Sequence, residues 1–216
     1  MFIGLLAWHV RAENRLDDQA FIELCGTGTP QEIENALKNG ADVNATVMQL
    51  ERRASPLIEA AEYNANPEVI TILIKAGADV NARDYFGSTP LMAAAVMEYN
   101  LEIITILIKA GADVNARNFL DNTPLTIAAS NSNLEIITAL IKAGADINAR
   151  GRDGRTPLIN VACFFDSNPE VITTLLELGA NPKARDNENK MAIDFARENE
   201  RFKNTDALMK LEEASR

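Results

Sequence analysis

One ten-residue phrase recurs along the chain at nearly constant spacing, and it constrains the fold more than any other feature. Clear copies read KAGADVNARD, KAGADVNARN and KAGADINARG, and more divergent copies read KNGADVNAT and ELGANPKARD. The glycine of the phrase occurs in steps of 37, 34, 33 and 35 residues, at Gly40, Gly77, Gly111, Gly144 and Gly179. A period of this size indicates a tandem-repeat array, in which each unit packs against its neighbours.

A Ser/Thr-Pro-Leu triplet follows the glycine in four copies. Pro90, Pro124 and Pro157 each lie thirteen residues after their glycine, and Pro56 lies sixteen residues after Gly40. The hydroxyl before the proline can cap a helix, and proline suits the first helical position. The glycine can take the left-handed conformation that ends a helix. Each unit is therefore predicted to be helix, linker, helix, glycine stop and exposed turn.

The repeats predict one domain over residues 16–216. Its six units span approximately 16–45, 46–82, 83–116, 117–149, 150–184 and 185–216. The first unit lacks the Thr-Pro-Leu opening and the last has a more polar exterior, as terminal units require. The turn at Thr46–Ala54 is three residues longer than the others. Such an insertion often lies on the binding face of a repeat protein, but it is also tolerated at low cost in any surface loop.

Residues 1–15 form a separate apolar N-terminal segment. It begins MFIGLLAWHVRA, which is shorter than the roughly 20 apolar residues that a membrane span needs. Residues 1–12 are either a truncated signal peptide with a small-residue cleavage site ending at Ala12, or part of an extra helix that covers the first repeat. The first interpretation predicts a periplasmic or secreted protein, and the second predicts a cytoplasmic one.

Charge limits the classes of partner. The formal net charge is −10, and such a surface repels the phosphates of nucleic acids and anionic membranes. A protein partner with a basic and apolar surface fits this charge better. We therefore expect no nucleic-acid binding and no membrane insertion, and we expect a monomer.

No residues are spaced as a catalytic or metal-binding set. His9 is the sole histidine and lies outside the array. Recurrent aspartates such as Asp79 follow the helix-stopping glycine, where a carboxylate can bond to its own turn. Cys25 and Cys163 belong to the first and fifth helix pairs, roughly 30–40 Å apart for stacked helices, whereas a disulfide requires Cα atoms within about 7 Å. The sequence predicts no enzyme activity, cofactor, metal site or internal disulfide.

The Gly-Ala-Asp-Val-Asn-Ala phrase, the Asp-x-x-Gly-x-Thr-Pro-Leu opening at Asp84–Leu91 and the period of about 33 residues resemble those of ankyrin repeats. The resemblance covers roughly residues 16–214. It implies an all-α ankyrin-repeat solenoid of stacked helix–turn–helix units with protruding β-hairpin-like loops. In that family a histidine after Thr-Pro-Leu ties neighbouring hairpins, and its absence here predicts less rigid hairpins. The positions read Ile58, Met92, Thr126, Ile159 and Asp194.

The resemblance also implies a binding surface, the concave face made of hairpin tips and the ends of the first helices. The tip positions are Tyr85, Phe86 and Ser88, then Phe119, Leu120 and Asn122, then Arg152, Asp153 and Arg155, then Asn187, Glu188 and Lys190. The helix positions include Tyr63, Met97, Asn131 and Phe164.

Tips usually are polar because they face water. The apolar pairs Tyr85–Phe86 and Phe119–Leu120 therefore predict one apolar patch, with aromatic anchors typical of interface hot spots. In an alternative interpretation, Phe86 and Leu120 pack between hairpins and replace the missing histidine ties.

The predicted function is that of a non-catalytic protein–protein interaction module or scaffold. Two alternatives stay open. The same groove could serve a ligand-binding or enzyme-regulating subunit, or the array could be a structural spacer with no partner on its concave face.

Overall fold

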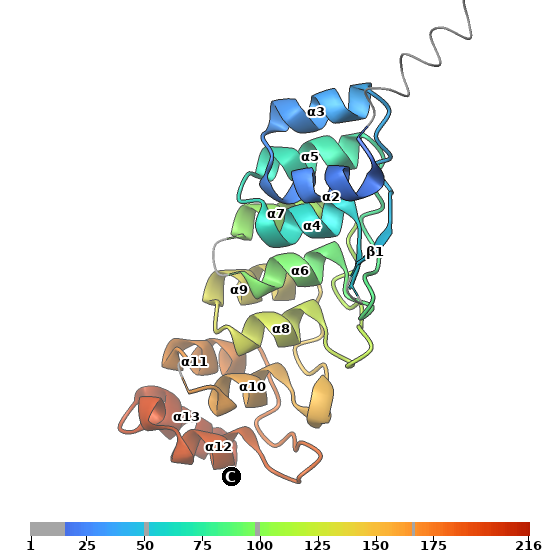
Figure 1. The fold of residues 1–216 in the computed structure, drawn as a ribbon. Coiled ribbons are helices and arrows are strands. Elements are labelled where there is room, and N and C mark those ends of the chain that lie inside the picture. Colours follow the sequence, from blue (N-terminus) through green and yellow to red (C-terminus); the bar gives the residue numbers. More distant parts are fainter. Residues whose placement is uncertain (1–15, 50–51, 98–99, 166) are drawn as a thin grey trace, which may run out of the picture. The chain divides into compact units, whose positions relative to one another are not determined.

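The computed structural model describes residues 16–49, 52–97, 100–165 and 167–216. The N-terminal segment 1–15, with both of its predicted interpretations, lies outside these residues. Twelve α-helices in the described stretches form six consecutive pairs, and one pair falls within each predicted repeat (Figure 1). Every helix in these stretches is too short or too polar to span a bilayer. The all-α repeat fold predicted from the sequence is confirmed.

The chain forms two compact units. Each unit is made of two stretches of the chain. The first unit comprises the residues up to Ala94 together with Thr105–Ala112, and the second comprises Ala95–Ile104 together with Asp113–Arg216. The boundary passes through α6 (Pro90–Val96) and α7 (Leu101–Lys109).

Helix pairs of the first unit stack in order. Its complete helices are α2 (Asp18–Thr27), α3 (Pro30–Lys38), α4 (Pro56–Tyr63) and α5 (Pro67–Lys75). The first helix of each pair packs on the next first helix, α2 on α4, and the second helices pair likewise, α3 on α5.

The second unit follows the same rule. It contains α8 (Pro124–Ser130), α9 (Leu134–Lys142), η1 (Arg152–Gly154), α10 (Pro157–Cys163), α11 (Pro169–Glu177), α12 (Ala192–Glu198), η2 (Glu200–Phe202) and α13 (Asp206–Ala214). First helix α10 packs against both α8 and α12, and second helix α11 packs against α13. The first helices therefore form one layer of the unit and the second helices form the other.

The predicted helix signals act as expected. The side chains of Ser55, Thr123 and Thr156 each accept a hydrogen bond from the third backbone N–H of the helix that follows, and a proline holds the first helical position. The five glycines of the recurring phrase have φ between +93° and +96°. This left-handed backbone ends each second helix.

The core consists of aliphatic side chains at helical spacing. Val69, Ile70 and Leu73 on α5 are fully buried, and so are their counterparts on α9 and α11. Burial of each such side chain contributes about 1.5–3 kcal/mol. Four positions that lack the family histidine, Ile58, Met92, Thr126 and Ile159, are also buried. Packing in the core thus explains why apolar residues occupy three of these four positions.

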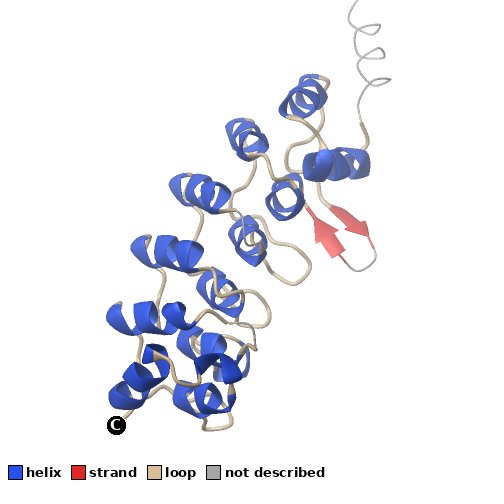
Figure 2. Ribbon diagram, turned by 90° about the vertical axis from the view of Figure 1, so that its left-hand side faces the viewer, coloured by secondary structure: helices blue, strands red, loops and turns tan. Residues whose placement is uncertain are grey.

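The longer turn at Thr46–Ala54 forms a two-stranded antiparallel hairpin of β1 (Val47–Gln49) and β2 (Arg52–Ala54), with Val47 opposite Ala54 (Figure 2). Val47 packs against Ile22 and Ala45 in the first unit. The hairpin is therefore attached to the first repeat through its β1 strand. Its role in binding stays a prediction.

Asparagines of the recurring phrase tie their repeat to the next. Asn115 donates from Nδ2 to the carbonyl oxygen of Gly144 at 3.0 Å, and its Oδ1 accepts from the Asp146 N–H at 2.8 Å. In the first unit Asn44 makes the same two bonds to Gly77 and Asp79. One amide side chain thus satisfies both a carbonyl at a helix end and an N–H of the following turn, which would otherwise depend on water.

Candidate protein-binding surface

Backbone hydrogen bonds shape the hairpin tips. In each of four loops the first residue donates its N–H to the carbonyl of the fifth: Asp84 to Ser88, Asn118 to Asn122, Gly151 to Arg155 and Asp186 to Lys190. In three of these loops the side-chain Oδ1 of the first residue also accepts two N–H groups of its own turn. This local network satisfies the turn internally. It leaves the second and third residues of each loop at the tip.

The apolar tip residues are exposed. Tyr85 is 46% exposed and Phe119 is 76% exposed, and Phe86 and Leu120 are exposed as well. The rings of Tyr85 and Phe86 meet edge to face, with centroids 5.4 Å apart. Tyr85–Phe86 belongs to the first unit and Phe119–Leu120 to the second. That these two pairs form one apolar patch stays a prediction.

The ends of the first helices carry further exposed apolar side chains. Tyr63 is the last residue of α4, and Phe164 follows α10; both are exposed, whereas Met97, just after α6, is half-buried. Phe165 is 77% exposed and was missed by the sequence analysis. Its only sequence signal is the Phe-Phe pair, which extends the helix-end position by one residue.

Several predicted contact residues also hold the framework. The Asn131 Nδ2 donates to the Val96 carbonyl oxygen at 2.7 Å and so links α8 to the preceding first helix. Asn122 Oδ1 accepts from the Arg152 N–H at 3.2 Å and links adjacent hairpins. The Ser88 N–H donates to Asp84 Oδ1 within its own tip.

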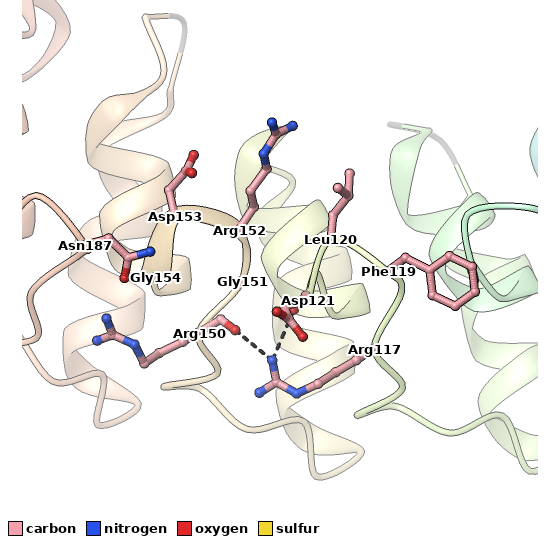
Figure 3. Close-up of a pocket in the computed structure, with 10 residues that line it drawn as sticks. All are labelled: Arg117, Phe119, Leu120, Asp121, Arg150, Gly151, Arg152, Asp153, Gly154 and Asn187. Atoms are coloured by element: carbon pink, nitrogen blue, oxygen red, sulfur yellow. Dashed lines mark hydrogen bonds between the residues drawn. The ribbon is translucent and has the colours of Figure 1, made fainter.

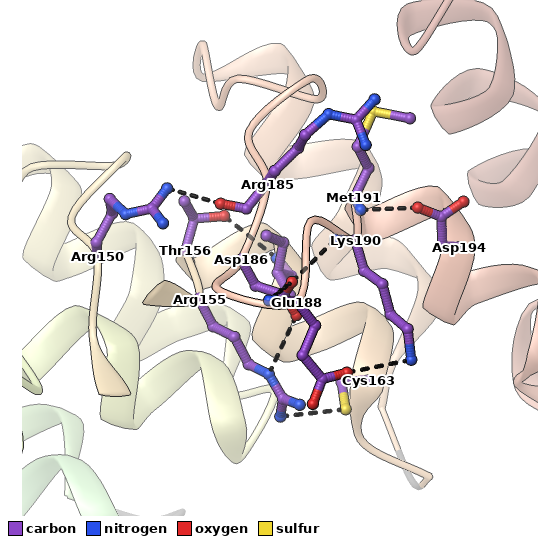
Figure 4. Close-up of polar contacts among 11 residues, drawn as sticks. Arg150, Arg155, Thr156, Cys163, Arg185, Asp186, Glu188, Lys190, Met191 and Asp194 are labelled. Atoms are coloured by element: carbon purple, nitrogen blue, oxygen red, sulfur yellow. Dashed lines mark hydrogen bonds and ion pairs between the residues drawn. The ribbon is translucent and has the colours of Figure 1, made fainter. Parts of the chain in front are cut away.

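Arg155 is half-buried between the last hairpin and the first helices (Figure 4). Its Nη1 donates to Cys163 Sγ at 3.5 Å, and its Nε lies 3.9 Å from Asp186 Oδ2. The guanidinium also lies 5.2 Å from the centre of the Phe195 ring. These contacts hold the guanidinium between α10, α12 and the last hairpin.

Arginines of the recurring phrase form a second set of ties, which the sequence analysis missed. Arg117 Nη1 donates to the carbonyl oxygens of Asp121 at 3.1 Å and Arg150 at 2.7 Å. Arg150 Nη1 in turn donates to the Arg185 carbonyl oxygen at 2.7 Å. Each of the two links its hairpin to the next one, as the family histidine would. The recurrence of Arg after Asn-Ala was the signal available in the sequence.

A pocket of about 520 Å³ lies among three hairpins of the second unit (Figure 3). Five predicted tip residues, Phe119, Leu120, Arg152, Asp153 and Asn187, line it together. The remaining lining comes from Arg117, Asp121, Arg150, Gly151 and Gly154. A volume of this size accommodates a few side chains of a bound peptide or a small ligand.

The described residues contain no gathering of three His, Cys, Asp or Glu side chains that could hold a metal ion. Both cysteines are free. Burial, and to a smaller extent the Glu59 carboxylate, raises the pKa of the Cys25 thiol from 9.0 to about 12. Since the thiolate is the nucleophile, we expect the buried Cys25 to be unreactive at neutral pH.

Comparison with family models agrees with this architecture. The model described as ankyrin repeats (three copies) matches residues 21–118 and again 116–186, well over half of the chain. The chain belongs to the ankyrin-repeat family. Ankyrin repeats generally mediate protein–protein interaction, and the family is typically non-catalytic. A search of curated proteins finds no match to this ankyrin-repeat chain.

Proposed function

We propose that this protein is a non-catalytic binding module that holds a partner protein on its hairpin tips and on the C-terminal ends of its first helices. One observation supports this proposal most strongly. Of the eleven large hydrophobic side chains exposed among the described residues, eight lie at these two places. They are Tyr63, Tyr85, Phe86, Val96, Phe119, Leu120, Phe164 and Phe165.

The exposed apolar side chains at these two places are mostly aromatic. All six exposed aromatic side chains of the described residues belong to this set. Aromatic residues supply large contact area with few rotatable bonds, which is why they are enriched at interface hot spots. A spacer with no partner at these positions would gain nothing from aromatic side chains in water. Exposed apolar residues elsewhere, Leu16, Leu178 and Met209, are single and separate in sequence.

The test compares two double variants of the full chain. Tyr85→Ala with Phe119→Ala removes one anchor from each unit. Leu178→Ala with Met209→Ala is the control, because these side chains are 45% and 60% exposed but lie on the second-helix layer. Each immobilised protein is incubated with lysate of the source cells, and captured proteins are quantified by mass spectrometry.

We expect the tip variant to lose at least about tenfold of a captured partner, in keeping with hot-spot energies of 1–2 kcal/mol or more. The control should retain it. Both variants should keep the wild-type melting temperature, since surface substitutions usually change stability by less than about 0.5 kcal/mol. Equal capture by all three proteins would favour a spacer. A lower melting temperature of the tip variant alone would favour a packing role for these aromatics.

A further inference from the structure

The hairpin between α9 and α10 is basic in an otherwise acidic protein. The chain has a net charge of −10, yet residues 150–155 read RGRDGR, with three arginines and one aspartate. Two of these arginines, Arg150 and Arg152, line the pocket of the second unit, where Arg117 adds a third guanidinium. Two carboxylates, Asp121 and Asp153, line the same pocket. The formal charge of the lining is therefore positive.

Arg152 has the side chain that is best placed to receive a ligand. It extends between Leu120 and Asp153, while Arg117 and Arg150 lie on the other side of the loops (Figure 3). Arg152 is exposed, and its guanidinium has no hydrogen-bond or ion-pair partner among the described residues. Arg150 donates to a neutral main-chain carbonyl, and no carboxylate in the described stretches pairs with it.

The loop around Arg152 is held in place. Its N–H donates to Asn122 Oδ1 at 3.2 Å, and the carbonyl of the next residue, Asp153, accepts from the Asn187 N–H at 2.8 Å. A Cβ at Gly154 would lie 2.3 Å from Asn187 Oδ1 and 2.5 Å from Arg150 Nη2, so the lining residues are closely fitted. The arginine is therefore presented from a tip that is fastened to both neighbouring hairpins, which lowers the entropy lost on binding.

We propose that this pocket receives an acidic segment of the partner protein, with a carboxylate on Arg152 and an adjacent apolar side chain against Leu120. This inference rests on the proposed function and specifies the partner's chemistry at the C-terminal unit. A guanidinium binds carboxylate through two parallel, charge-assisted hydrogen bonds. The exposed leucine beside it gives an apolar neighbour a surface to cover.

The local charge and the net charge predict opposite partners. A net charge of −10 predicts a basic partner, but contact energies depend on the groups that meet across the interface, whereas net charge acts mainly on encounter. Nucleic acid is disfavoured, because its chain of phosphates would extend beyond the pocket onto a protein with a net charge of −10, which repels it.

The experiment uses three fluorescent peptides of equal length in which leucine alternates with glutamate, glutamine or lysine. Binding to the full chain is measured by fluorescence anisotropy, alongside a single-stranded oligothymidylate. The variants are Arg152→Glu and the control Lys183→Glu, which makes the same change in net charge at an exposed residue outside the pocket lining. Circular dichroism checks that both variants are folded.

We expect the glutamate peptide to bind most tightly and to weaken with added salt. Arg152→Glu should raise its Kd by roughly tenfold or more, as loss of a charged interfacial contact does, while Lys183→Glu should stay within about twofold of wild type. Tighter binding of the lysine peptide, or equal effects of the two variants, would overturn the proposal. Oligothymidylate binding that Arg152→Glu abolishes would also overturn it and would point to a phosphate site.

The same variants separate this inference from the function on which it rests. If the Tyr85–Phe119 double variant loses the captured protein and Arg152→Glu retains it, the binding function stands and the acidic-segment proposal fails. If Arg152→Glu loses both the captured protein and the glutamate peptide, the proposal is supported. If the double variant captures as much protein as the wild type and the glutamate peptide still requires Arg152, then Tyr85 and Phe119 are not anchors for the partner. The acidic-segment proposal is then supported without them.

Discussion

Replacement of Asn115 by alanine should weaken the connection between two neighbouring repeats. Asn115 makes two hydrogen bonds to the following repeat, from Nδ2 to the Gly144 carbonyl oxygen at 3.0 Å and from the Asp146 N–H to its Oδ1 at 2.8 Å. A typical intramolecular hydrogen bond contributes about 0.5–1.5 kcal/mol net. The two together predict a loss of about 1–3 kcal/mol in the free energy of unfolding. The upper part of this range applies if water cannot reach the freed groups.

Urea unfolding followed by far-UV circular dichroism measures this loss. The matched control is Asn39→Ala. Asn39 is exposed and its side chain has no hydrogen bond among the described residues, and the clear copies of the phrase have alanine there, as at Ala76. The control should therefore stay within about 0.5 kcal/mol of wild type. If Asn115→Ala proves as stable as the control, the amide does not couple the repeats and the reasoning is wrong.

The remaining predictions concern the core, one tip and the cysteines. Leu140→Ala removes a fully buried side chain and should cost about 2–5 kcal/mol in urea unfolding. Gly154→Ala should destabilise more than Gly144→Ala: both have positive φ, but only at Gly154 would a Cβ meet neighbouring atoms. Iodoacetamide should modify the partly exposed Cys163 in the native protein and spare Cys25, as peptide mass mapping would report. Because folding raises the Cys25 pKa from 9.0 to about 12, the stability from its buried thiol is complete below pH 9 and decreases as pH rises toward 12. In urea unfolding at alkaline pH, the free energy of unfolding of Cys25→Ala should therefore decrease less with rising pH than that of the wild type.

The ties between repeats have a consequence for cooperativity. In a linear array, stability is a sum of repeat stabilities and terms between nearest neighbours. Asn44, Asn115, Arg117 and Arg150 each bond to a neighbouring repeat through side chains that project into solvent-exposed loops. Much of the coupling between loops therefore comes from polar side chains, in addition to the apolar contacts between helices.

Much of the fold was predictable because its signals are local. A hydroxyl before a proline caps its own helix, and a glycine at positive φ ends its own helix, so Thr123, Pro124 and Gly144 act within their own repeat. The contacts made by the predicted site residues were less predictable. Arg155 and Asn131 were assigned to partner contact from their positions, yet the structure gives them bonds within the protein.

Local pattern and composition were sufficient for the helix pairs, their order and the aliphatic core, because each depends on residues within about one turn or one repeat of each other. Only the folded chain reveals that Asn115 and Arg117 bond to the next repeat, and that Leu120, Arg152 and Asn187 line one pocket. These residues come from different repeats. Their proximity results from the packing of one helix pair on the next, which sets the spacing and direction of the loops and has no counterpart in any single copy of the phrase.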